Sequence, residues 1–168
     1  MPRELITIQI GQCGMQLGTN FWELALEEHA ANISKPYYDD ALSSFFRNVD
    51  TRYDGGKEIP VGDGTGEIRS LKARTVLVDM EQGVINNVLK GPLADLFDTT
   101  QVIHDVSGSG NNWAHGHCEY GPKYHEQISE TIRRTVEPCD SLQSFFLMHS
   151  LGGGTGSGLG TYILKLLQ

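Results

Sequence analysis

The chain has 168 residues, a length that suits one domain and allows a sizeable hydrophobic core. Hydrophobic residues make up 39% of it and charged residues 20%, as in ordinary globular proteins, which excludes wholesale disorder. The 21 acidic side chains outnumber the 13 basic ones and give a net charge of −8. This balance disfavours nucleic acid as a partner, because proteins that bind a phosphate backbone carry a basic face.

The sequence also argues against a membrane or secreted protein. No apolar run approaches the roughly 20 residues needed to cross a bilayer, so we expect no membrane partner. The start of the chain lacks a small-residue cleavage site and leads directly into an apolar run, so we predict no signal peptide. The three cysteines, Cys13, Cys118 and Cys139, form no Cys-x-x-Cys pair, which suits a reducing compartment such as the cytoplasm.

Four short apolar runs predict strands that are covered on both faces of a sheet. They are Leu5–Ile10, Arg74–Asp79, Gln101–Asp105 and Phe145–His149. A helical pattern follows each run, at about 17–28, 82–89, 112–137 and 156–168. Strands that alternate with helices pair in parallel, so the sequence predicts an α/β fold, a parallel sheet with crossover helices.

The apolar spacing also predicts which helix faces are buried. In the first helix, Leu17, Phe21 and Leu24 share one side and are expected to point into the core. In the long third helix, Ile128 and Ile132 form the apolar stripe. Both stripes would pack against the sheet.

Two stretches depart from the regular alternation. The segment at about 48–70 contains Pro60 and five glycines, and it predicts a long glycine-rich surface loop. The last helix, about Gly156–Gln168, reaches no stop signal. We therefore expect residues 1–168 to be the amino-terminal part of a larger domain, with its remaining strands absent.

The strongest chemical motif lies between the fourth strand and the last helix. It reads Ser150-Leu151-Gly152-Gly153-Gly154-Thr155-Gly156-Ser157-Gly158. Glycines allow the backbone to turn tightly and approach a ligand, and the free amides at a helix start favour an anion. A flexible linker is the plainer interpretation, but its position between a buried strand and a helix favours a phosphate-binding loop.

The motif belongs to neither of the two common nucleotide loops. It does not match Gly-x-Gly-x-x-Gly, which disfavours a dinucleotide site, and no Gly-Lys-Ser/Thr follows. Without that lysine, a metal ion is needed to balance the phosphates. Asp79 and Glu81 follow the second strand and could hold Mg2+, although a helix-start acid that complements the dipole is the alternative.

The other strand ends also carry glycine-rich or polar turns. The first strand runs into Gly11-Gln12-Cys13-Gly14, and the third leads to Ser107-Gly108-Ser109-Gly110-Asn111-Asn112-Trp113-Ala114. Asn111 or Asn112 could cap the following helix, contact the ligand, or both. Because ligands of open α/β sheets bind beyond the carboxyl ends of the strands, four such turns at one edge predict a nucleotide site.

These motifs resemble the signatures of the tubulin superfamily, and the resemblance spans the whole chain. It rests on Gly11–Gly14, on Asn111-Asn112-Trp113 and above all on Gly152–Gly158. Within the superfamily, the stretches Ser44–Arg52 and Ser70–Glu81 are most similar to the epsilon branch. The resemblance implies a Rossmann-like tubulin nucleotide-binding domain, here incomplete.

The resemblance also implies a set of site residues. It implies that Glu81, assisted by Asp79, binds Mg2+, and that the bound nucleotide is GTP or GDP. The residues implied to bind the nucleotide are Gln12, Cys13, Gln16, Asn112, Ser150, Gly153, Gly154, Thr155, Gly156 and Ser157. One departure is Met15, which stands where the family usually has Asn and cannot donate a hydrogen bond.

At the level of function, the resemblance implies a GTP-binding cytoskeletal protein of the cytoplasm, at a centriole, basal body or microtubule-organising centre. Its expected partners are alpha, beta or centriolar tubulins through longitudinal contacts. Hydrolysis in the family needs an acidic loop from a neighbouring subunit, so no catalytic residue is assigned to this chain. The alternative is a stand-alone nucleotide phosphohydrolase, which is disfavoured because no arginine finger is evident in the turns.

Overall fold

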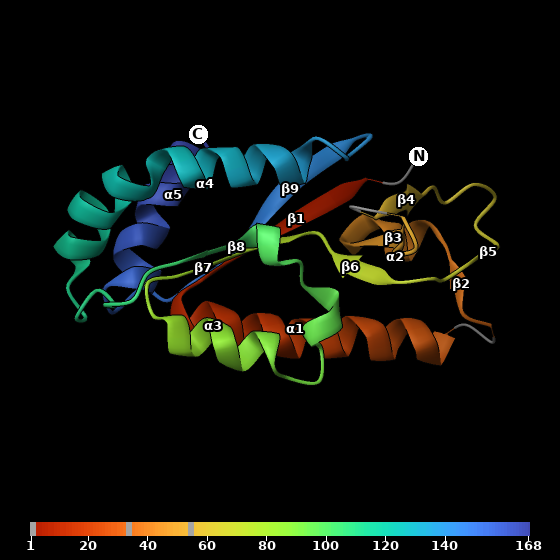
Figure 1. Cartoon of the computed structure of the whole chain (residues 1–168), viewed down its shortest axis with the longest axis horizontal. Coiled ribbons are helices and arrows are strands. Elements are labelled where there is room, and N and C mark those ends of the chain that lie inside the picture. The colour runs from red at the N-terminus through yellow and green to blue at the C-terminus, as the bar shows by residue number, and fades with distance from the viewer. Residues whose placement is uncertain (1–2, 33–34, 54–55) are drawn as a thin grey trace.

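The computed structural model describes residues 3–32, 35–53 and 56–168 (Figure 1). Its centre is a sheet of four parallel strands in the order β8-β7-β1-β9, which confirms the predicted parallel α/β fold. The strands are β1 Glu4–Ile10, β7 Thr75–Asp79, β8 Val102–His104 and β9 Leu142–Met148. Since all four run the same way, their carboxyl ends and the turns that follow lie along one edge.

Helices cover the sheet on both faces (Figure 1). On one face lie α1 Gly11–Asn32 and α3 Gln82–Leu89, and on the other lie α4 Gly121–Val136 and α5 Gly160–Leu166. The predicted helices at 112–137 and 156–168 each begin with a π-helical turn, at His115–Tyr120 and Thr155–Leu159. Two 3-10 turns, Ala94–Leu96 and Thr99–Gln101, connect α3 to β8.

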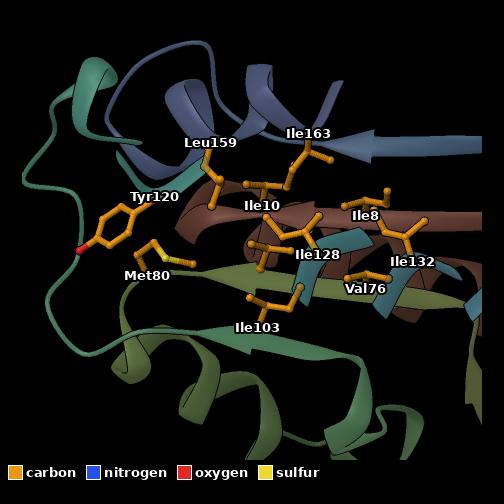
Figure 2. Packing of buried hydrophobic residues seen from close by; sticks show 11 residues of the cluster. Ile8, Ile10, Val76, Met80, Ile103, Tyr120, Ile128, Ile132, Leu159 and Ile163 are labelled. Carbon is orange, nitrogen blue, oxygen red and sulfur yellow. The ribbon is translucent and has the colours of Figure 1, made fainter. Parts of the chain in front are cut away.

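Strand alternation divides the core into two clusters. One cluster lies on the side of α4 and α5, and Figure 2 shows most of it. It includes Ile8, Ile10, Val76 and Val78 from the strands and Ile128, Ile132 and Ile163 from the helices. The second cluster, on the side of α1 and α3, includes Met15, Trp22, Leu77 and Ile85. The predicted stripe of Ile128 and Ile132 is therefore confirmed.

The predicted inward face of α1 is wrong for two of its three residues. Leu17 and Leu24 are 51% and 55% exposed, while Phe21 is half-buried beside Trp22. The helix instead turns glycines toward the sheet: a Cβ at Gly14 would lie 2.3 Å from the Met148 carbonyl oxygen. Because glycine has no side chain, α1 packs closely against the sheet through its glycine face. This contact, rather than the leucine spacing, decides which face of the helix is buried.

The predicted loop at about 48–70 is also wrong, because short strands cross it. β3 Phe46–Asp50 pairs antiparallel with β4 Lys57–Ile59 and β6 Leu71–Ala73, and β5 Gly66–Glu67 pairs with β2 Tyr37–Tyr38. A short helix, α2 Asp40–Phe45, precedes β3. Gly56, Gly62 and Gly64 do mark turns, whereas Gly66 begins β5 and Gly55 lies outside the described residues. β4 and β5 have only three and two residues, which is too short for their sequences to show a period.

Gly14→Ala is predicted to destabilise the full-length protein by roughly 1–3 kcal/mol, the usual range for overpacking. The new methyl group would meet backbone of β9 rather than a flexible side chain, so helix and strand must separate. Gly83→Ala in α3 is the control, since a Cβ there has nothing within 4 Å. Chemical denaturation of both variants measures the difference, and equal stability would contradict the packing described.

Candidate functional site

The turns at the carboxyl edge of the sheet enclose a cavity of about 590 Å³. Four separate segments contribute to it, one after each strand of the sheet. Its lining residues are Gly11, Gln12, Cys13, Asp79, Glu81, Val106, Ser107, Gly108, Ser109, Gly110, Asn111, Ser150, Gly152, Gly153, Gly154, Thr155 and Gly156. Among these described residues none is lysine or arginine, so any anion held here is met by backbone amides, hydroxyls and amide side chains.

The loop after β9 is shaped by glycines and by its own hydroxyl groups. Gly153 has a φ of +83°, a conformation that side chains with a Cβ rarely adopt. The Ser150 hydroxyl donates to the Gly152 carbonyl oxygen at 2.7 Å, and the Ser157 hydroxyl donates to the carbonyl oxygen of Gly153. These bonds hold the turn in a compact form.

The first turn touches this loop through backbone. Gly11 has a φ of +73°, and a Cβ there would lie 3.0 Å from the Gly156 amide nitrogen. Gln12 and Cys13 follow directly, and both line the cavity. The site set predicted from the sequence lacked Gly11, whose role depends on a neighbour that is distant in the chain.

The loop after β8 closes the cavity from another side. Its Ser109 hydroxyl lies 2.8 Å from the Thr155 hydroxyl, which joins it to the loop after β9. The Gly108 amide donates to the Met80 carbonyl oxygen at 2.7 Å, which joins it to the segment after β7. The three glycine-rich or polar segments therefore form one connected cradle.

The two asparagines of this loop have different positions. Asn111 lines the cavity with a φ of +55°. Asn112 does not line it: its side-chain oxygen accepts bonds from the amides of Ala114 at 3.0 Å and His115 at 3.4 Å and so caps the following helix. Nucleotide contact by Asn112 stays a prediction. Asn111, which does line the cavity, is not among the nucleotide-binding residues that the resemblance implies.

Two other predicted residues lie outside the main cavity. The Ser157 side chain is buried within the turn, and Gln16 lines a smaller cavity of about 220 Å³ between α1, α3 and the segment after α3. Gln12 borders both cavities. Met15, the departure from the family pattern, is buried in the core beside this smaller cavity.

Asp79 and Glu81 both line the cavity, at the same sheet edge as the sequence predicts. Asp79 is only 3% exposed, and its Oδ1 accepts a bond from the Glu81 amide at 3.1 Å, whereas its Oδ2 is buried and has no hydrogen-bond partner among the described residues. Burial raises the pKa of Asp79 to about 6; the Glu81 amide opposes this rise, and the Glu81 carboxylate adds to it. A cation would satisfy the orphaned oxygen.

The carboxylates at the cavity suit Mg2+ that is bound together with phosphate, rather than a metal ion that protein side chains hold alone. The described residues contain no cluster of three or more His, Cys, Asp or Glu side chains suited to a metal. Mg2+ is commonly held by one or two carboxylates, with phosphate oxygens and water completing its shell. Asp79 and Glu81 can supply such a pair beside an anion.

None of the helices in the described part of the chain combines the length and apolar character of a membrane span.

A profile of the tubulin/FtsZ family, GTPase domain, matches residues 4–168. The tubulin epsilon chains of Mus musculus and Homo sapiens are each 59% identical over 167 residues, which is 97% of this chain and 34% of theirs. The tubulin beta-3 chain of Echinococcus multilocularis is 40% identical over 169 residues, 99% of this chain and 35% of that protein.

This chain therefore spans about a third of the length of the curated relatives it matches. The profile covers more than nine-tenths of the chain, and its matched span includes every segment that lines the cavity. Both epsilon chains are more similar to it than the beta-3 chain is. The chain belongs to the tubulin superfamily, whose GTPase domain it carries, and it resembles the epsilon chains.

Proposed function

We propose that this chain binds GTP or GDP, with the phosphates in the cavity at the carboxyl edge of the sheet and Mg2+ beside Asp79 and Glu81. The observation that carries the proposal is a connected glycine-rich cradle next to Asp79 Oδ2, a buried oxygen that finds no hydrogen-bond partner in the part of the chain that the structure describes. Amides suit phosphate oxygens, and the carboxylates suit a metal ion that balances the charge. One cavity thus offers both halves of a metal–phosphate complex.

The phosphate-binding role is assigned to Ser150, Gly153, Gly154, Thr155 and Gly156. All five residues line the cavity, beside the first turn, which meets this loop at Gly156. The positive end of the following helix adds to the attraction for an anion.

Gln12, Cys13 and Gln16 are proposed to contact the rest of the nucleotide. They follow the first turn along α1, away from the glycine-rich loop, which suits a ligand longer than its phosphates. Gln12 borders both the main cavity and the smaller one that Gln16 lines. Mg2+, when bound, would supply positive charge next to the phosphates.

We assign the protein a structural role in the cytoskeleton, with the nucleotide acting as a switch for assembly. The turns around the cavity carry exposed apolar side chains: Leu151 is 92% exposed, Val106 79% and Trp113 46%. Exposed apolar groups around a ligand site are expected where another protein covers it. Longitudinal contact with alpha, beta or centriolar tubulins, and a place in the cytoplasm at the centriole or basal body, are the finer parts of this proposal.

The test is direct nucleotide analysis of the full-length protein. We expect guanine nucleotide to be released when the purified protein is denatured, and we expect added GTP and GDP to bind more tightly than ATP by calorimetry. Turnover should be low in dilute, monomeric protein and should rise on assembly. Rapid turnover by the monomer would instead support a stand-alone phosphohydrolase.

Gly154→Ala is predicted to weaken GTP binding at least tenfold in the full-length protein. A Cβ at Gly154 would lie 2.3 Å from the Ser109 hydroxyl oxygen and 2.9 Å from the Asn112 amide nitrogen, so the two loops that close the cavity must separate. Gly66→Ala in β5 is the control, because its Cβ would meet nothing within 4 Å. Calorimetric titration compares them, and wild-type affinity in Gly154→Ala would remove the phosphate assignment.

Glu81→Gln is predicted to reduce the Mg2+ dependence of GTP binding while affinity without metal changes little. The substitution keeps the size of the side chain and removes one of two carboxylates at the cavity. The matched control is Glu126→Gln, an exposed position on α4 outside the cavity. GTP titrations over a range of Mg2+ concentrations provide the measurement, and an unchanged Mg2+ response would leave Glu81 only its place at the start of α3.

A further inference from the structure

The loop between β8 and α4 is held from behind by a tyrosine that does not reach the cavity. Tyr120 ends the π-helical turn before α4 and is 4% exposed. Its hydroxyl donates to the Gly108 carbonyl oxygen at 2.8 Å and lies 3.3 Å from the Ser107 hydroxyl. Figure 2 shows the ring at the end of the hydrophobic cluster beside Met80, with its oxygen directed at the loop.

A second set of contacts, made by Asp105, holds the beginning of the same loop. Asp105 Oδ2 accepts bonds from Lys123 Nζ at 2.8 Å and from the Tyr124 hydroxyl. The Lys123 ammonium group also lies 4.8 Å from the ring centre of Tyr124 and 5.6 Å from that of Tyr120. Asp105, directly after β8, and the loop that follows it are therefore both attached to one short stretch of helix, residues 120–124.

The loop has a particular need for such support. Gly108, Gly110 and Asn111 have φ values of +58°, +57° and +55°. Glycine-rich backbone loses much conformational entropy when it is ordered, so an unsupported loop would sample many shapes that do not match a ligand. Gly108 is held on both sides, since its amide donates to Met80 while its carbonyl accepts from Tyr120.

We propose that Tyr120 is a positioning residue for nucleotide binding: its hydroxyl sets the Ser107–Asn111 turn in the shape that receives the phosphates. This inference rests on the proposed function and deepens it. Tyr120 does not line the cavity, so it acts through the loop, whose Ser107, Gly108 and Asn111 do. A turn set in advance lowers the entropic cost of binding.

The test replaces one oxygen atom. Tyr120→Phe keeps the ring in its apolar contacts and removes only the hydroxyl, and one lost hydrogen bond predicts about five- to tenfold weaker binding of Mg2+–GTP. Tyr162→Phe is the matched control, because it removes a hydroxyl that lies 2.9 Å from His125 Nδ1 and does not face the cavity. Calorimetry on the full-length proteins should show near wild-type affinity for this control.

Amide hydrogen exchange in the nucleotide-free protein separates positioning from general destabilisation. In Tyr120→Phe we expect faster exchange at the amides of Gly108, which donates to Met80, and Asn112, which donates to Ser109, with unchanged exchange in β1 and β7. Faster exchange throughout the sheet would mean a merely structural role and would overturn the proposal, as would wild-type affinity with wild-type exchange. If the wild-type protein binds no GTP, the proposed function fails by that result alone, and exchange at the loop still decides whether the tyrosine holds it.

Discussion

Close approach of backbone to backbone at the carboxyl edge of the sheet is the constraint on which the rest of this structure depends. At Gly14 helix α1 meets the end of β9, and at Gly11 the first turn meets the loop after β9. The two π-helical turns cross in the same way: a Cβ at Gly116 would lie 2.2 Å from the Gly154 carbonyl oxygen, and one at Gly158 would lie 2.3 Å from that of Trp113. Each crossing leaves no room for a side chain and holds two segments of backbone against each other.

This packing explains how an acidic chain can hold an anion without basic side chains at the site. The crossings hold the backbone of the turns in place, and the amides of a turn that is already ordered need little reorganisation to meet phosphate oxygens. In the proposed complex the remaining charge would fall to a cation beside Asp79, whose Oδ2 has no hydrogen-bond partner among the described residues. Burial of this carboxylate also raises its pKa, because the charged form has lost water.

A second source of stability is the attachment of the inserted strands. Arg74, at the start of β7, is 3% exposed, and its guanidinium group donates to the Ser43 carbonyl oxygen at 3.1 Å and pairs with Glu58 at 3.3 Å. Asn48 holds the same region together by bonding the Glu67 carbonyl oxygen and the Arg69 amide. The Arg74 contacts connect the start of β7 to α2 and β4, and the Asn48 contacts join β3 to the segment at residues 67–69. The glycine-rich segment is therefore an ordered part of the domain.

The sequence by itself determined the class of the fold and the edge of the sheet at which the cavity lies. Buried strands of a parallel sheet read as continuous apolar runs, and glycine-rich turns that directly follow such strands are typical of phosphate-binding loops, so both features follow from local pattern. Tertiary structure alone decided which face of α1 is buried, because Gly14 and Gly18 are inward only by virtue of β9 and Gln9. It also placed Asn111 at the cavity and Asn112 at the start of the following helix, and it formed short strands within a segment whose sequence predicts a loop. Those outcomes depend on partners far along the chain, such as Thr155 for Ser109 and Glu58 for Arg74, and no local pattern specifies which distant residue will be the neighbour.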